Sequence, residues 1–324
     1  MLQKPLTFPG QKPITSSDFY IAPEYTSSEN DDYDYGLVLL PGNSDDGFGW
    51  STQLTDSDLN NRAVSVCGYP GDKEYKTMWI SGGNIMSHTA RRIYYSDDTS
   101  GGESGSPVYT WYKGYWTVIG IHHGNPTSGE CRNDGPRFIL EMISRFVKRM
   151  NSKKALLSMQ FSAVYVRASG SDLSSSKSIG GIVDCKYNIL TDYERFYIYP
   201  LEMPPSLAIQ PDRIRVVIES AQSNNVFIRL DASKAHHEYK SSGQGTVDCH
   251  YGVKEYEAYW CEKEDGNDVF SFISTCFPNF RIRVDGSGVN SQHTIGGTVN
   301  CQYYSDSDQF GPAGSYEKLK IVDA

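Results

Sequence analysis

Long apolar runs are missing from this sequence of 324 residues. The best one, LVLL at 37–40, is far shorter than the roughly 18 apolar residues that a membrane-spanning helix needs. The start of the chain, MLQKPLTFPG, lacks the apolar core of a secretory signal peptide. Positive charge is also scarce, since 30 lysines and arginines face 39 aspartates and glutamates, a net charge of −9. We therefore expect no membrane span, and neither nucleic acid nor an anionic membrane as a main partner.

The seven cysteines include no Cys-x-x-Cys pair, so the sequence predicts no zinc site, and we expect no cofactor. An odd number of cysteines leaves at least one thiol unpaired and does not assign the chain to an oxidising or a reducing compartment. Residues that favour turns and strands are abundant, with 30 glycines, 15 prolines and 23 tyrosines. This composition predicts an all-β protein with many turns.

One amphipathic helix interrupts this pattern, because apolar residues recur at helical spacing between Ile139 and Met150. A polar segment, NSKK at 151–154, follows and is typical of a linker. Since 324 residues exceed the size of one ordinary core, we place a domain boundary here, which gives domains 1–154 and 155–324.

Three copies of one phrase occur after that boundary: GGIVDCKY at 180–187, QGTVDCHY at 244–251 and GGTVNCQY at 296–303. Each copy follows an alternating strand with an arginine in register, and we expect a short closing strand at 193–198, 268–273 and 316–321. The arginines are Arg167, Arg229 and Arg283. Three units of this length cannot each bury a core, so threefold closure around a shared core predicts a β-trefoil.

The cysteines of the three phrases, Cys185, Cys249 and Cys301, are expected at equivalent core positions as small hydrophobic residues. The repeated phrase resembles the fascin-like branch of trefoils. The Gln-x-Trp signature of ricin-type lectins is absent, which places sugar binding of that kind in doubt. The ligand of this domain is open between a carbohydrate and a protein.

The first half contains the segment TSGGESGSPVY at 99–109, in which Ser104 lies between glycines. Glycines let the backbone fold so that the N–H groups of Gly102 and Ser104 point into one small volume, as an oxyanion hole requires. Such a serine is a nucleophile only if a neighbouring base accepts its proton. A plain Gly/Ser turn is the alternative reading of this segment alone.

Three motifs occur in a fixed order: VCGYPGDKEYKTMW at 66–79, the Ser104 motif, and VIGIHHG at 118–124. Together they resemble the glutamyl endopeptidase branch of the chymotrypsin-like serine proteases, from about residue 19 to residue 150. The resemblance implies a double β-barrel with a C-terminal helix, cleavage of peptide or protein substrates after glutamate or aspartate, and an extracellular location.

The resemblance also assigns roles to residues. Asp34, just ahead of the apolar run at 36–40, is expected to be the orienting carboxylate, and Asp31 and Asp32 are expected to lie in a solvated turn. Thr99 and His122 would contact the carboxylate of the substrate side chain, with His122 supplying a hydrogen-bond donor or a full charge. For His122, a core histidine bonded to the backbone is the alternative.

The general base is the missing part. In this fold the base histidine precedes the aspartate, yet residues 1–33 contain no histidine, and His88 lies in the second barrel. His123 is expected to point to the face opposite His122. The chain is then either a truncated protease or a catalytically dead homologue that binds through its trefoil. Truncation is favoured, because removing strands from a closed barrel exposes edges that proteins avoid.

Overall fold

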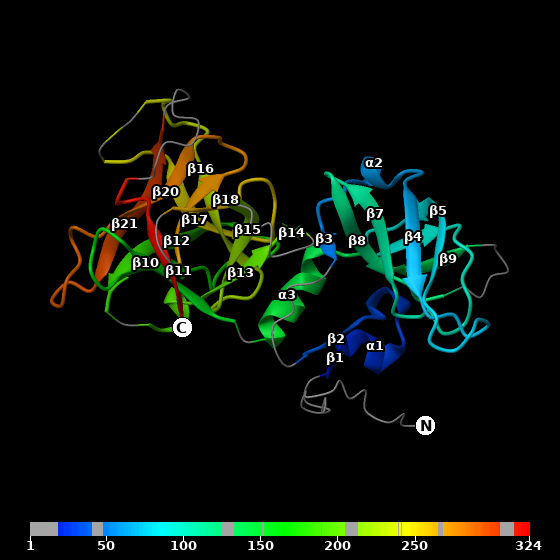
Figure 1. The fold of residues 1–324 in the computed structure, drawn as a ribbon. Coiled ribbons are helices and arrows are strands. Elements are labelled where there is room, and N and C mark those ends of the chain that lie inside the picture. Colours follow the sequence, from blue (N-terminus) through cyan, green and yellow to red (C-terminus); the bar gives the residue numbers. More distant parts are fainter. Residues whose placement is uncertain are drawn as a thin grey trace. The chain divides into compact units, whose positions relative to one another are not determined.

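The computed structural model describes residues 19–40, 48–124, 132–150, 152–188, 190–204, 213–238, 240, 242–264, 268–304 and 314–324. They form an all-β protein with few helices (Figure 1). The chain divides into two compact units, one with Met1–Phe146 and Glu202–Gln210, the other with Val147–Leu201 and Pro211–Ala324. No helix of the described part is long and apolar enough to cross a bilayer.

The first unit contains, in chain order, β1 (Phe19–Ile21), α1 (Pro23–Ser28), η2 (Asp31–Tyr33), β2 (Gly36–Val38), β3 (Gly49–Ser51), α2 (Asp56–Leu59), β4 (Ala63–Gly68), β5 (Trp79–His88), β6 (Arg92–Tyr95), β7 (Pro107–Tyr112), β8 (Tyr115–Ile121), β9 (Asn133–Pro136) and most of α3 (Leu140–Arg149), with β14 (Glu202–Met203) added from later in the chain. Neighbouring strands in its main sheet follow the order β14-β3-β8-β7-β4-β5-β6-β9.

Six of these strands close into a barrel. β8, β7, β4, β5, β6 and β9 are paired in that order, and two bridges, Gly120 with Arg137 and Gly124 with Asp134, join the β9 end back to β8. Closure needs a glycine at 135, because a Cβ there would lie 1.8 Å from the carbonyl oxygen of Ile121. The interior is filled by buried side chains from alternate strand positions: Val64, Val66, Ile85, Ile93, Tyr95, Val108 and Ile119.

Outside this barrel, β1 and β2 form a two-stranded sheet of their own. A small core of Ala22, Tyr35 and Met142 lies between this region and α3, and Phe146 packs edge-on against the ring of Tyr35 with ring centroids 6.0 Å apart. The helix expected between Ile139 and Met150 is confirmed as α3, with one apolar face buried. Because η2 and β2 flank Asp34, this packing fixes where that carboxylate lies.

The second unit contains β10 (Lys154–Ser158), β11 (Val164–Ser169), β12 (Ile179–Tyr187), η3 (Asp192–Glu194), β13 (Phe196–Pro200), β15 (Arg213–Ser220), β16 (Val226–Asp231), β17 (Thr246–Tyr251), β18 (Ala258–Lys263), β19 (Val269–Ser274), β20 (Phe280–Asp285), β21 (Ile295–Tyr303) and β22 (Leu319–Asp323). Six of them pair in a ring, β10-β13-β15-β18-β19-β22 and back to β10. The other six form the hairpins β11–β12, β16–β17 and β20–β21.

The three hairpins carry the repeated phrases and contact one another, since β12 pairs with both β17 and β21. Each phrase pairs with its own preceding strand in the same register, so that Val166, Ile228 and Ile282 lie opposite Cys185, Cys249 and Cys301. All three cysteines have no exposed surface. Their expected equivalent core positions are therefore confirmed.

One strand assignment from the sequence is wrong. The closing strand of the middle copy is β18, and 269–273 of the expected range lies in β19, which pairs with β18 and β22. The missed signal is a Tyr-Glu pair ahead of each closing strand: Tyr193-Glu194, Tyr256-Glu257 and Tyr316-Glu317. Each glutamate is buried, and each tyrosine ring lies under the repeat's arginine, with Arg167, Arg229 and Arg283 at 5.3, 5.2 and 4.5 Å from the ring centroids.

Candidate active site

Ser104 lies in the tight turn that leads into β7. Gly102 and Gly105 on either side have φ angles of 106° and 88°, in the region that favours glycine. A Cβ on Gly102 would also lie 3.0 Å from the carbonyl oxygen of Tyr69. The turn is held against the strand that follows β8, because the Gly105 N–H donates to the His122 carbonyl over 2.7 Å. The glycines around Ser104 are thus required by the backbone itself.

The interior of the turn is held by Glu103, whose side chain is buried and accepts a hydrogen bond from the Ser100 N–H over 2.8 Å. Within the described residues, the N–H groups of Gly102 and Ser104 donate to no backbone or side-chain acceptor. Two free amide donors, one on the exposed serine itself and one two residues before it, are what an oxyanion-binding turn requires.

The Ser104 hydroxyl donates to the carbonyl oxygen of His123 over 2.9 Å. All seven histidines belong to the described part of the chain, and none of their rings is hydrogen-bonded to this hydroxyl. The hydrogen-bond partner of the Ser104 hydroxyl among the described residues is thus a backbone carbonyl and not an imidazole.

His123 connects Ser104 with Asp34. Its Nε2 is 3.5 Å from Asp34 Oδ2, and its Nδ1 is 3.3 Å from Asp134 Oδ1. The buried Asp134 is also paired with Arg92 over 2.6 Å. The His123 ring is thus enclosed by two carboxylates, while its backbone carbonyl accepts from Ser104. Sequence reasoning identified Asp34 and did not find its contact with His123 or the role of Asp134.

A cavity of about 430 Å³ opens beside Ser104. Three residues chosen from the sequence, Thr99, Ser104 and His122, all line it. Its remaining lining residues are Ser96, Asp97, Asp98, Ser100, Gly101, Gly124, Arg132 and Asn133. The structure therefore brings residues from the turn before Ser104 and from the segment after β8 to one cavity.

His122 in this cavity is a neutral group. The side chain is 3% exposed, and burial, with a smaller contribution from the neighbouring His123, lowers the pKa of His122 to about 4. Arg132 also lines this cavity, where its guanidinium stacks over the Tyr94 ring at 4.4 Å and donates to Ser87 Oγ over 3.4 Å. Of the two expected forms of His122, the structure favours the uncharged hydrogen-bond donor.

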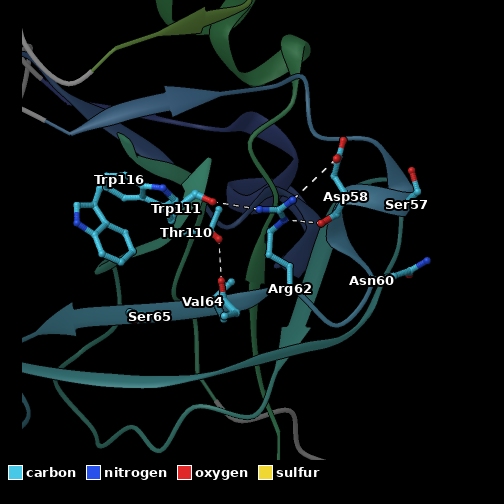
Figure 2. Close-up of a pocket in the computed structure, with 10 residues that line it drawn as sticks. Ser57, Asp58, Asn60, Arg62, Val64, Ser65, Thr110, Trp111 and Trp116 are labelled. Atoms are coloured by element: carbon cyan, nitrogen blue, oxygen red, sulfur yellow. Dashed lines mark hydrogen bonds and ion pairs between the residues drawn. The ribbon is translucent and has the colours of Figure 1, made fainter. Parts of the chain in front are cut away.

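A second cavity of the same unit, about 420 Å³, lies between α2 and the β7–β8 hairpin (Figure 2). Trp111 and Trp116 form its aromatic wall, with ring centroids 5.2 Å apart and planes at 78°. Arg62 crosses it and donates to the backbone carbonyls of Asp58 and Trp111. This cavity contains none of the residues selected from the sequence, so the cavity beside Ser104 is the candidate active site.

No protein-family model matches the chain. Among curated proteins, it is similar to a glutamyl endopeptidase of Bacillus licheniformis, with 33% identity over 141 residues, 41% of this chain and 44% of the relative. A glutamyl endopeptidase of Staphylococcus aureus is 39% identical over 89 residues, 28% of this chain and 23% of the relative. An extracellular metalloprotease of Bacillus subtilis is 37% identical over 114 residues, 34% of this chain and 36% of that protein.

The chain thus spans less than half the length of these relatives. A solved structure of a Glu endopeptidase matches 43% of this chain and 62% of its own, with 23% identity and a TM-score of 0.34. An SDF2-like protein from Arabidopsis thaliana matches 53% of this chain and 92% of its own, with 7% identity and a TM-score of 0.33. At these TM-scores the structural likeness adds nothing to the sequence similarity. Over the matched part, the chain is thus similar in sequence to glutamyl endopeptidases.

Proposed function

We propose that the first unit is a serine endopeptidase that cleaves polypeptides after glutamate or aspartate. The observation that carries this proposal is the turn at Ser104, which has an exposed serine and two free amide donors, and where Ser104 lines a cavity together with Thr99 and His122. Ser104 is the nucleophile, and the amides of Gly102 and Ser104 bind the oxyanion. Each such donor contributes roughly 3–4 kcal/mol to the transition state.

The reaction needs an imidazole between Asp34 and Ser104. Ser104 attacks the carbonyl carbon, its proton passes to the imidazole, and the imidazolium then protonates the leaving amine. Asp34 is proposed to orient that ring. This proposal is supported by the position of Asp34 Oδ2, 3.5 Å from Nε2 of His123, whose ring also contacts Asp134 and is not hydrogen-bonded to the Ser104 hydroxyl. The catalytic imidazole therefore has to come from a group other than the seven histidines of this sequence.

A second function is favoured by the fact that the Ser104 hydroxyl is hydrogen-bonded to a backbone carbonyl and not to an imidazole. Without an imidazole at Ser104 Oγ, the chain acts as a catalytically dead homologue that binds a partner through its second unit. We propose that this unit is a β-trefoil, supported by the ring of six paired strands and the three hairpins that carry the repeats. Its ligand is a carbohydrate or a protein, and the location is extracellular, as the name of one relative suggests.

A peptide substrate that carries its own histidine distinguishes the protease function from the binding function. The full chain is incubated with a peptide that has His-Glu before the bond to be cut, and with a matched peptide that has Gln-Glu. We expect cleavage after glutamate in the first peptide, at least tenfold faster than in the second, and loss of this cleavage in Ser104→Ala. No cleavage of either peptide would favour the binding function, and cleavage that survives Ser104→Ala would exclude Ser104 as the nucleophile.

A further inference from the structure

The two ring nitrogens of His122 have different surroundings. Nδ1 lies 2.6 Å from the hydroxyl oxygen of Tyr95, a residue of β6 with no exposed surface. Nε2 has no hydrogen-bond partner among the described residues, and His122 lines the cavity beside Ser104. Because a neutral imidazole has one N–H and one acceptor nitrogen, the proton position decides what the ring offers to a ligand.

Tyr95 has one proton and two neighbouring acceptors. Its oxygen is 2.6 Å from His122 Nδ1 and 3.2 Å from the carbonyl oxygen of Asp134. Burial raises the pKa of Tyr95 well above its usual range, so the hydroxyl keeps its proton at every physiological pH.

The Asp134 carbonyl is already occupied. It accepts from the His123 N–H over 2.9 Å and from the Gly124 N–H over 3.4 Å, which uses both of its lone pairs. The Tyr95 proton is therefore directed to His122 Nδ1, the closer acceptor. With Nδ1 as an acceptor, the ring proton of the neutral His122 lies on Nε2.

We propose that Tyr95 is a positioning residue that sets the specificity of this site by holding His122 as the Nε2–H tautomer. This rests on the proposed function, because the cavity is taken to bind the acidic side chain of a substrate. The Nε2–H and the Thr99 hydroxyl, which has no partner among the described residues, then offer two neutral donors to one carboxylate. A carboxylate accepts a charge-assisted hydrogen bond from each donor, whereas glutamine has one oxygen and its NH₂ group could pair only by turning the Thr99 hydroxyl into an acceptor. The arrangement therefore favours glutamate over glutamine.

Nitrogen-15 NMR of the histidine-labelled full chain at about pH 7 tests the tautomer directly. We expect protonated Nε2 and unprotonated Nδ1 for His122, and loss of this single tautomer in Tyr95→Phe. His250 is the matched control, because its Nδ1 faces the Gly252 carbonyl at 2.9 Å and the Glu257 carboxylate at 3.3 Å and must carry the proton in both proteins. An Nδ1–H tautomer of His122 in the unmodified chain overturns the proposal even if Tyr95→Phe fails to fold.

The ligand class is tested by titrating the same labelled protein with an acetylated tetrapeptide amide ending in glutamate, and with its glutamine counterpart. We expect the glutamate peptide to shift the His122 nitrogen signals, with at least tenfold weaker binding of the glutamine peptide. Equal binding of both peptides overturns the selection of glutamate. If neither peptide shifts His122 while the tautomer is as expected, the proposed substrate class fails and the role of Tyr95 in fixing the ring stands.

Discussion

At the scale of single residues, the catalytic elements are tied together by backbone as well as by side chains. The His122 backbone exchanges hydrogen bonds with Gly105 and Ser106, and the Ser104 hydroxyl donates to the His123 carbonyl. The His123 ring in turn reaches Asp34. Ser104 could be selected from its glycine-rich turn, and Asp34 and His122 from motifs that resemble a known family. Asp134 and Tyr95 could not, since their roles depend on β6 and β9 pairing within the barrel.

His122 is expected to act on specificity. His122→Ala removes the donor at Nε2, so cleavage of the His-Glu peptide should fall at least tenfold while cleavage of a His-Gln peptide changes little. The measurement is kcat/KM for both peptides. An equal fall in kcat/KM for both peptides would mean that His122 has a structural role and that another residue determines the preference for an acidic side chain.

Asp97 provides a pH-dependent prediction. It is 4% exposed, Oδ1 has no hydrogen-bond partner, and burial raises the pKa of Asp97 to about 6. Because this pKa lies above the ~3.9 of a free aspartate, the folded protein holds the proton more tightly, and the contribution to stability falls as pH rises from about 4 to about 6.

Asp97→Asn should therefore increase the free energy of unfolding at pH 7.5, by at most about 3 kcal/mol, and should have little effect at pH 4. Urea unfolding of both proteins at the two pH values measures this. A variant that is destabilised equally at both pH values would show that the Asp97 carboxylate is not the source of the pH dependence.

At the scale of elements, closure of the first barrel depends on one glycine. With 1.8 Å between a Cβ at position 135 and the Ile121 carbonyl oxygen, Gly135→Ala has to move β9 away from β8. We expect a loss of more than about 3 kcal/mol in unfolding free energy. Gly101→Ala is the control, because a Cβ there meets no atom within 4 Å. Equal, small effects of both substitutions would mean that the close approach is relieved without cost.

The second unit depends on the buried glutamates of its Tyr-Glu pairs. Glu257 is 1% exposed, accepts from the Lys254 N–H over 2.6 Å and faces His250 Nδ1 at 3.3 Å. Glu257→Ala removes the acceptor of the Lys254 N–H and one of the two acceptors that face the buried His250 Nδ1. We therefore expect a loss of about 2–3 kcal/mol in urea unfolding, against less than about 0.5 kcal/mol for the exposed Glu255→Ala. If the Glu257→Ala protein is as stable as the Glu255→Ala control, the Tyr256-Glu257 pair does not stabilise the repeat.

The strands that sequence reasoning missed have physical causes. The repeated phrases alternate regularly and are recognised, whereas β18 mixes Trp260 and Glu262 on the face that does not line the core. β14 has two residues, Glu202 and Met203, and its pairing with β3 leaves no pattern in the chain. The same pairing places Glu202 and Met203 with the first unit, although both lie beyond the domain boundary expected at the linker.

At the scale of the whole molecule, the two units differ in how completely they cover their apolar surface. The second has a continuous core and a ring of paired strands, whereas the two-stranded sheet of the first leaves Phe19, Ile21 and Val38 at 47%, 54% and 43% exposure. Residues 155–324 expressed alone should therefore unfold cooperatively, and 1–154 alone should bind a hydrophobic dye. An unfolded 155–324 beside a well-folded 1–154 would contradict this division.

The central claim is that Ser104 is a competent nucleophile that lacks only its imidazole, and the rate of cleavage of a glutamyl peptide against imidazole concentration tests it most directly. Without imidazole, the full chain should turn over roughly 10⁶-fold below an intact triad. The rate should then rise in proportion to added imidazole, with cleavage after glutamate and no rise in Ser104→Ala. An ordinary protease rate in the absence of imidazole, or no rise in the unmodified chain, would contradict the account.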